Sequence, residues 1–465
     1  MSDPLALVPL AAAARGGRID AHGARELVGA GVTLLQRCAP LVRALSGKRA
    51  AILLPTSPAF LTALAASEGR GTVLVNPLAA PPEVEHQLRD ANVGAAFTIA
   101  ALQDKLPRAF PRVLLDDAPA RARSIINDAA RDIDLGSHSG IALEGEMDAP
   151  GRDEEAVIVY TSAMAGTPLG AILTHRNLLA NAHAVVDGLA FDERSVVLAA
   201  LPWAHLFGFT VTLVAPMLSG GRVITLPRFS PLRMLDMVRT EGVTTLLGVP
   251  SVFAGLLSVL ERSGGPLGAG SLAHCFCGGA PLAVELQERW ERATGLPLRQ
   301  GYGLTEAGPA CLFNPPSRPN RPGTLGVCLP RMEVAITDGE VCVRGENVFA
   351  GYVRGGAHGL QVVDGWLHTG DNGTMDGNGY VTFTGVRKAM FTRHGFNIYP
   401  KELERAIGAM KGVRRVTVRA IPEPSRENDI ALEITGAVSE DDVKRWCEER
   451  LSAYKQPGRI EIRAR

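Results

Sequence analysis

The feature that most constrains the fold of this chain is a repeated alternation of short apolar runs with stretches of helical periodicity. Short apolar runs, typical of buried strands, lie at 50–54, 72–75, 95–99, 156–160, 196–201, 223–226 and 244–249. Apolar residues at helical spacing lie at 21–45, 58–67, 82–92, from 176 onward, and at 231–241. Such alternation predicts βαβ units, and hence an α/β fold with doubly wound sheets.

Two regions depart from this alternation. Residues 102–153 are weakly patterned and are expected to form loops with one or two short helices. Residues 334–384 read as short strands with Gly-rich turns, which predicts a small β subdomain. A small mobile α+β lobe is expected to follow, with helices at 400–410 and 440–451 and strands at 415–421 and 429–435. We therefore expect two domains, 1–385 and 386–465.

Composition limits the class of protein. Forty-eight Lys and Arg balance forty-eight Asp and Glu, so no broad field attracts nucleic acid or an anionic membrane. No apolar run reaches the roughly 18 residues that a membrane span needs. The amino terminus lacks the basic start of a secretory signal. Seven scattered cysteines favour a reducing cytoplasm, and Cys275 and Cys277 are interpreted as buried strand thiols, although a metal pair is conceivable.

Three polar clusters are candidates for a ligand site. In AVIVYTSAMAGTPLGAILTHRNLL (156–179), a strand leads through a Gly- and Pro-containing loop to a helix. Such a loop can present backbone N–H groups and hydroxyls to phosphate oxygens, but an ordinary turn would look the same. The sequence is not a Walker A motif.

The second cluster is RQGYGLTEAG (299–308) and the third is DGWLHTGD (364–371). Gly301 and Gly303 would let the backbone approach a ligand, and the Tyr302 ring between them could stack on a base. Thr305 and Glu306 offer a hydroxyl and a hard carboxylate suited to Mg²⁺. The alternatives are a helix cap and a plain β-turn.

Together, these clusters resemble in order and spacing the signature segments of the adenylate-forming superfamily of acyl-CoA synthetases, aryl-CoA ligases, luciferases and peptide-synthetase adenylation domains. The resemblance runs from about residue 26 to 462 and includes AILLPTSPAF, CFCGGAPL, VRGENVFAGY, GFNIYPKELE and ERLSAYKQP. LPWAHLFGFTVTL (201–213) resembles the fatty-acyl branches. The resemblance implies a ligase that makes an acyl-adenylate from a carboxylic acid and ATP, and then transfers the acyl group to a thiol.

The resemblance also implies roles for individual residues. Catalytic roles fall on Thr161, Ser162, His205, Thr305, Glu306 (the Mg²⁺ ligand) and the hinge residue Lys388. Nucleotide binding falls on Gly166, Gly279, Ala280, Gly301, Tyr302, Gly303, Asp371 (ribose) and Arg387. The acid would meet His205, Phe207, Val249, Ser251 and Gly278, and the thiol tunnel would include Gly395, Phe396 and Asn397. The implied cofactors are ATP or acyl-AMP, Mg²⁺, and CoA or a phosphopantetheine carrier such as an acyl carrier protein.

Several positions depart from the family pattern. Ala163, Met164, Ala165 and Leu169 stand where Gly, two Thr and Lys are usual in the phosphate loop. Val386 replaces the usual ribose-binding Arg, for which the adjacent Arg387 is a candidate substitute, and Ala389 replaces an acidic residue. The sequence also has no counterpart of the lysine of the usual PKTxxGK segment. Lys455 belongs to the earlier YKxP segment, so we expect it to be solvated or structural.

These departures predict an impaired adenylation step, because a positioned donor in a dry site is worth roughly 10²–10³ in rate. Three hypotheses follow. The chain performs both half-reactions, or it mainly forms thioesters from an adenylate, or it is a non-catalytic homologue that binds adenylate or acyl ligands as a sensor or partner subunit. The sequence does not identify the acid, the thiol or the oligomeric state.

Overall fold

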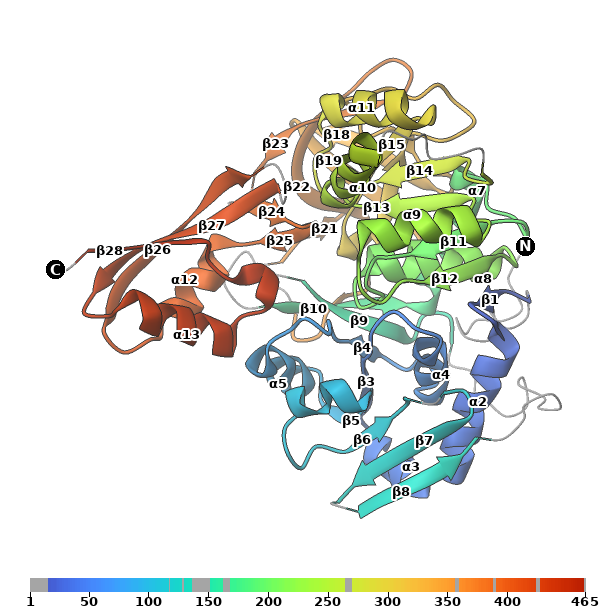
Figure 1. The fold of residues 1–465 in the computed structure, drawn as a ribbon, viewed down its shortest axis with the longest axis vertical. Coiled ribbons are helices and arrows are strands. Elements are labelled where there is room, and N and C mark those ends of the chain that lie inside the picture. Colours follow the sequence, from blue (N-terminus) through green and yellow to red (C-terminus); the bar gives the residue numbers. More distant parts are fainter. Residues whose placement is uncertain are drawn as a thin grey trace.

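The computed structural model describes residues 16–116, 118–127, 129–135, 151–161, 168–263, 270–355, 359–387, 390–423 and 427–463. Two nine-stranded sheets make up most of the large body, and a small three-stranded sheet lies to one side of it (Figure 1). The helices that the structure describes include none long and apolar enough to cross a membrane. The α/β fold expected from the alternating pattern is confirmed.

The first sheet contains the amino-terminal βαβ units. Its five central strands, from β9 through β6, are parallel, and the flanking strands are antiparallel. In spatial order the strands are β20 (Gly351–Tyr352), β10 (Leu169–Thr174), β9 (Glu155–Thr161), β4 (Thr72–Leu74), β3 (Arg49–Leu53), β5 (Val93–Thr98), β6 (Arg112–Leu114), β7 (Arg121–Ile126) and β8 (Ala129–Asp134).

The second sheet is parallel from β15 to β1, with antiparallel strands at both ends. Its near-continuous burial explains why these strands read as apolar runs rather than alternating ones. In spatial order the strands are β17 (Val327–Cys328), β16 (Ala310–Phe313), β15 (Leu298–Gly303), β14 (His274–Cys277), β13 (Thr245–Gly248), β11 (Val196–Ala199), β12 (Arg222–Thr225), β1 (Arg18–Ile19) and β2 (His22–Gly23).

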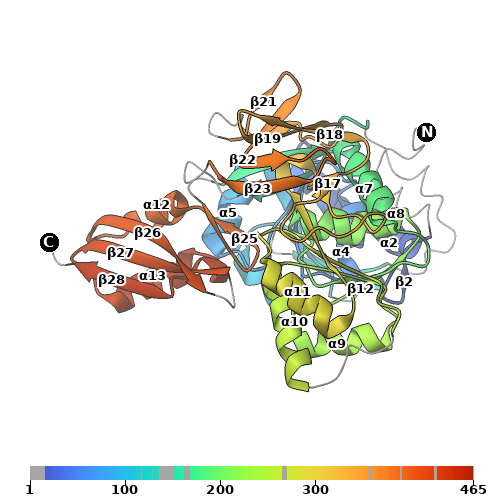
Figure 2. The same cartoon turned by 90° about the horizontal axis from the view of Figure 1, so that it is seen from above.

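Helices cover these sheets (Figure 2). The larger hydrophobic core contains residues of both sheets, and a smaller cluster packs α5 against the first sheet. One of the helices, η2, is a π-helical segment that begins at Phe207, beside the candidate site. The helices of the large body are α2 (Ala24–Arg37), α3 (Ala39–Leu45), α4 (Ala59–Ala66), α5 (Pro81–Asp90), η1 (Ala100–Lys105), α7 (His175–Leu189), η2 (Phe207–Val214), α8 (Ala215–Leu218), α9 (Pro231–Thr240), α10 (Pro250–Ser263), α11 (Val284–Thr294) and η3 (Thr305–Ala307).

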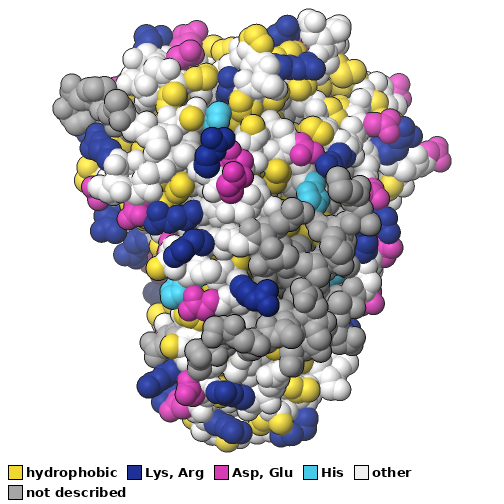
Figure 3. Space-filling view, turned by 90° about the vertical axis from the view of Figure 1, so that its right-hand side faces the viewer, with side chains coloured by type: hydrophobic (Ala, Val, Ile, Leu, Met, Phe, Trp, Pro, Cys, Tyr) yellow, Lys and Arg dark blue, Asp and Glu magenta, His cyan; other side chains and the backbone are white. Residues whose placement is uncertain are grey.

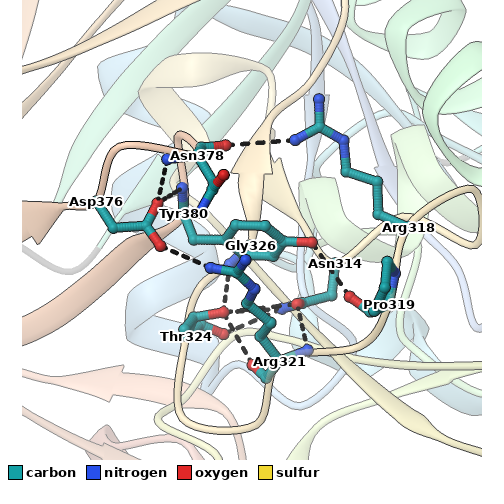
Figure 4. Close-up of polar contacts among 9 residues, drawn as sticks. All are labelled: Asn314, Arg318, Pro319, Arg321, Thr324, Gly326, Asp376, Asn378 and Tyr380. Atoms are coloured by element: carbon teal, nitrogen blue, oxygen red, sulfur yellow. Dashed lines mark hydrogen bonds and ion pairs between the residues drawn. The ribbon is translucent and has the colours of Figure 1, made fainter.

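The β subdomain is an antiparallel sheet of β18 (Met332–Thr337), β19 (Glu340–Gly345), β22 (Trp366–Met375), β21 (Val362–Val363) and β23 (Val381–Val386). Its β22–β23 turn is fastened to the loop after β16 (Figure 4). Arg321 forms an ion pair with Asp376 at 2.6 Å and lies over the Tyr380 ring at 4.0 Å, while the Tyr380 hydroxyl donates to the Pro319 carbonyl. These contacts fix the strand that carries Asp371 relative to the second sheet.

The carboxyl-terminal part has its own hydrophobic cluster, formed by residues from Ile398 to Leu451. The short hairpin of β24 and β25 precedes a three-stranded sheet with two helices, and in both cartoon views α5 is the helix of the large body that faces them (Figures 1 and 2). The elements are β24 (Phe391–Arg393), β25 (Phe396–Ile398), α12 (Pro400–Gly408), β26 (Val413–Glu423), β27 (Glu427–Gly436), α13 (Glu440–Arg450), η4 (Ala453–Lys455) and β28 (Arg459–Arg463).

Two local expectations were wrong. In the described part of 102–153, β6, β7 and β8 extend the first sheet where loops with short helices were expected. In β7 the buried positions include Ala122 and Ser124, so the alternation is hard to see in the sequence. Arg123 pairs across the strands with Asp132 at 2.6 Å. The second correction concerns the residues before α7, which were assigned to the loop: β10 begins at Leu169.

The charges are distributed as the zero net charge suggests. On the face seen in Figure 3, Lys and Arg side chains alternate with Asp and Glu, and hydrophobic side chains lie between them. The drawn side chains of described residues on that face form no large field of one sign. This agrees with a protein whose ligand is recognised inside a cavity.

Candidate active site

The candidate active site is a cavity of about 1030 Å³ between the large body and the carboxyl-terminal lobe. It is lined by the ends of β9 and β10, by the loops after β14 and β15, by β22 and β23, and by the β24–β25 hairpin. Strands of parallel sheets end here, which is where open α/β sheets place ligands. Among the predicted site residues, Thr161, His205, Phe207, Gly278, Gly279, Ala280, Gly301, Tyr302, Gly303, Thr305, Glu306, Asp371, Gly395, Phe396 and Asn397 line it.

One side of the cavity, where adenosine is expected to bind, is built from Tyr302 and Asp371. The Tyr302 hydroxyl donates to the Asp371 carboxylate at 2.7 Å, and the Thr369 hydroxyl accepts from the Asp371 backbone N–H at 3.1 Å. Desolvation and the nearby Asp371 charge raise the pKa of Tyr302 well above its usual value, so the phenol keeps its proton. A tyrosine ring and a carboxylate, held together, suit a base and its ribose hydroxyls.

Glycines let the backbone approach this side of the cavity. Gly279 has a φ of +79°, in the left-handed region that glycine enters without strain. A Cβ on Gly303 would clash with the Pro309 carbonyl, which explains why β15 ends in glycine.

Glu306 lies on η3 and is buried, with an exposed fraction of 7%. The Tyr352 hydroxyl donates to its Oε1 at 2.7 Å, and desolvation, with the neighbouring Glu306 charge, raises the pKa of Tyr352. A buried carboxylate that faces a cavity next to the Thr305 hydroxyl fits Mg²⁺, which takes few protein ligands and completes its shell with phosphates and water.

His205 lines the cavity next to the β24–β25 hairpin. Its Nδ1 accepts the Phe207 N–H at 3.2 Å, and its ring meets the Phe396 ring edge-on at a centroid distance of 6.3 Å. Although the side chain faces the cavity, desolvation lowers the pKa of His205 to about 4. The imidazole is therefore neutral near pH 7 and leaves its Nε2–H free of the Phe207 contact.

The β24–β25 hairpin brings Gly395 against the loops of the large body. A Cβ on Gly395 would clash with Val249, and a Cβ on Gly279 would lie 3.8 Å from the Gly395 carbonyl oxygen. Val249 and Ser251 themselves are described but do not belong to the cavity lining. Val249 supports Gly279 and Gly395 from outside the cavity, so its expected contact with the acid has no geometric support.

Arg387 turns away from the cavity. Its Nε donates to Asn372 at 2.8 Å, its Nη1 pairs with Glu340 at 3.2 Å, and Val386 lines the cavity instead. Neighbouring side chains along extended backbone point to opposite faces. Arg387 therefore points away from the face on which Val386 stands in place of the family's usual ribose-binding arginine. It thus lies outside the cavity lining. Ser162, Gly166 and Lys388 lie outside the described residues.

Lys455 was expected to be solvated or structural, and the solvated alternative is wrong. Its side chain is 5% exposed and contacts two carboxylates, Glu83 and Glu402. All three residues line the cavity. The sequence around Lys455 carried no signal for this contact, because Glu83 is more than 300 residues away.

The fold and the site define a nucleotide-dependent enzyme of the adenylate-forming type. The model of the AMP-binding enzyme family matches residues 40–353, and the chain belongs to that family. It is 32% identical to a feruloyl-CoA synthase of Amycolatopsis sp, over 90% of this chain and 85% of the relative. It is 29% identical to a long-chain-fatty-acid–CoA ligase of Bacillus subtilis, over 90% and 82%.

Two solved structures of similar sequence identity differ in how well they superpose. A malonyl-CoA ligase in a ternary product complex with methylmalonyl-CoA and AMP is 26% identical, with a TM-score of 0.78 over 98% of each chain. MatB from Rhodopseudomonas palustris with ATP bound is also 26% identical, with a TM-score of 0.66 over 96% of this chain and 91% of that one. The chain is an acyl-CoA synthetase-like acid–thiol ligase, and as a whole it superposes better on the malonyl-CoA ligase than on MatB.

Proposed function

We propose that the protein joins a fatty or aryl carboxylic acid to the thiol of CoA through a bound acyl-adenylate, and that thiol transfer is its faster half-reaction. The observation that carries the proposal is the position of Gly395–Asn397. These residues share one cavity with Tyr302 and Asp371, so an adenylate and an incoming thiol can meet there.

Individual residues have distinct tasks in this proposal. Tyr302 stacks on the adenine, Asp371 accepts hydrogen bonds from the ribose, and Gly279 and Ala280 run along the base. Glu306 and Thr305 would hold Mg²⁺, which supplies charge neutralisation for the phosphates when it is bound. Phe207 and Gly278 line the acyl side, where His205 can donate its Nε2–H to the reacting carbonyl.

The phosphate side supports a slow adenylation step. Leu169 lines the cavity at the start of β10, opposite Thr161 in the β9–β10 pairing. The apolar Leu169 side chain supplies no positive charge to stabilise the leaving pyrophosphate. Val386, at the end of β23, supplies none either. Thiol attack on a bound adenylate releases AMP and depends less on such groups.

The test compares the two starting materials. The protein is incubated with CoA and either dodecanoyl- or feruloyl-adenylate, or with the matching free acid, ATP and Mg²⁺. We expect thioester to form from the adenylates at least about tenfold faster, since one lost donor alone is worth more than that. A phosphopantetheinylated carrier protein replaces CoA in a second series, which decides the acceptor.

Calorimetry with AMP provides the control for the site itself. Measurable AMP binding with no thioester from either adenylate would reject the ligase proposal while keeping the nucleotide site. Equal rates from adenylate and free acid would reject the slow adenylation step and leave an ordinary synthetase.

A further inference from the structure

A buried lysine joins the two parts of the molecule. Lys455 Nζ on η4 donates to Glu83 Oε1 at 2.7 Å and to Glu402 Oε1 at 2.5 Å. The side-chain exposures of Lys455, Glu83 and Glu402 are 5%, 14% and 7%. Glu83 belongs to α5 of the large body, whereas Glu402 belongs to α12 of the carboxyl-terminal lobe. The ammonium group therefore bridges the cavity wall from one body to the other.

Two further hydrogen bonds fix the position of the Glu83 carboxylate. Its Oε2 accepts the Ala80 N–H at 2.8 Å at the first turn of α5, which fixes the carboxylate relative to the helix. The Ser452 hydroxyl donates to the same Oε2, which adds a second contact from the lobe. Burial alone would lower the pKa of Lys455, but Tyr454 and the two carboxylates outweigh burial and raise it.

Packing and polar contacts connect the Lys455 segment to the hairpin that carries the residues proposed to meet the thiol. The adjacent Tyr454 ring stacks on Phe396 with a centroid distance of 4.2 Å and an interplanar angle of 17°. Arg393 donates to the Tyr454 carbonyl at 3.2 Å and pairs with Asp429 at 3.0 Å. The β24–β25 hairpin, which carries Gly395–Asn397, and the Lys455 segment are therefore held as one unit.

We propose that Lys455 is a positioning residue for thioester formation: by pairing with Glu83 it docks the lobe on α5 in the orientation that holds Gly395–Asn397 in the cavity. The inference rests on the proposed thiol transfer, and it adds a named interdomain contact to it. Without Lys455, the Glu83 and Glu402 carboxylates would lie buried together with no cation between them, and without Glu83, Lys455 would pair only with Glu402 of its own lobe. The ion pair between the two bodies therefore depends on both Lys455 and Glu83. When the lobe moves away, water can solvate all three groups.

The experiment uses the full chain with Lys455→Met, Glu83→Gln and the double variant. Gln at 83 keeps an oxygen for the Ala80 N–H. Lys444→Met is the matched control, because Lys444 lies on α13 of the same lobe, is 52% exposed and pairs with Glu440 of its own helix. Lys455→Arg keeps the charge and should recover part of the loss.

Three readouts are measured on each variant. In thioester formation from dodecanoyl- or feruloyl-adenylate and CoA, we expect each single variant to lose at least about tenfold in kcat. The double variant should be no slower than the worse single one, because both changes break one contact. AMP affinity should stay within about twofold, since Tyr302 and Asp371 are untouched, and Lys444→Met should match the wild type.

Small-angle X-ray scattering without substrates provides the third readout. The scattering profile should change in Lys455→Met and Glu83→Gln but not in Lys444→Met. Unchanged profiles in both, or independent additive losses in the double variant, would overturn the positioning role. A wild type without thioester activity would refute the proposed function while scattering still decides the docking contact. Lys455→Met could also destabilise the lobe, which a lowered melting temperature would reveal. In that case Glu83→Gln decides the positioning role, because this change leaves the core of the lobe intact.

Discussion

The two sides of the cavity are built in different ways. On the adenosine side, Tyr302 and Asp371 extend from strands of two different sheets and are joined by a hydrogen bond of 2.7 Å. On the phosphate side, Thr161 and Leu169 stand at the facing ends of β9 and β10, and Leu169 brings only apolar surface. The groups proposed to recognise base and ribose are thus fixed by a contact between two sheets, whereas the groups proposed to face the phosphates end neighbouring strands of one sheet, where Leu169 offers no charge.

The largest effect that would sharpen this comparison is expected from Asp371→Ala. The change removes the carboxylate proposed to bind the ribose and leaves the half-buried Tyr302 hydroxyl without its acceptor. We expect AMP affinity to fall by about a hundredfold, since a hydrogen bond to a charged group is worth about 1.5–3 kcal/mol. Calorimetry with AMP measures the loss.

Asp364→Asn serves as the control for that change, because Asp364 lies in the exposed turn that precedes the same strand. Its φ is +50°, a conformation that asparagine tolerates. Asp371→Ala with unaltered AMP affinity would show that the ribose is bound elsewhere, and the adenosine side would lose its assignment.

A smaller effect is expected from adding charge to the phosphate side. Leu169→Lys places a cation at the cavity wall, and we expect pyrophosphate exchange with a carboxylic acid and ATP to rise about tenfold. Leu232→Lys adds the same charge at a side chain that is 68% exposed, outside the cavity lining, and should have no effect. If Leu169→Lys leaves exchange unchanged while thioester formation proceeds, the weakness of adenylation lies in another residue.

The smallest effect concerns pH and the residue between the two sides. Because burial lowers the pKa of His205 to about 4, its imidazole stays neutral from about pH 5.5 to 8 and takes up a proton only below that range. His205→Gln should therefore slow thioester formation by a factor that changes less than about twofold across this range. An inflection near pH 6.5 that disappears in His205→Gln would contradict a neutral donor and indicate a titrating base.

Local patterns predicted much of the architecture. The strands of the parallel sheets were predictable because burial on both faces leaves long apolar runs, as in β13 and β14. The strands β7 and β8 were not predictable in this way. Small and charged residues occupy many of their positions, so the sequence shows no clear apolar alternation. In the site, Tyr302 and Asp371 come from motifs with distinctive spacing.

Contacts between distant segments could not be predicted in the same way. The direction of the Arg387 side chain depends on the register of β23 against β22, where one residue decides which face it takes. The environment of Lys455 depends on how α5 meets the carboxyl-terminal lobe. Neither property is encoded within a few residues of the side chain concerned.

The buried cysteines have a consequence for an enzyme that handles acyl-adenylates, which acylate any thiolate they meet. Burial raises the pKa of Cys275 to about 12 and that of Cys277, directly before Gly278, well above its usual value. Burial likewise raises the pKa of Cys311. None of the seven cysteines, all described, belongs to the cavity lining. The cysteines of the protein are therefore poor acceptors, which leaves the incoming substrate thiol as the thiol that the activated acyl group meets in the cavity.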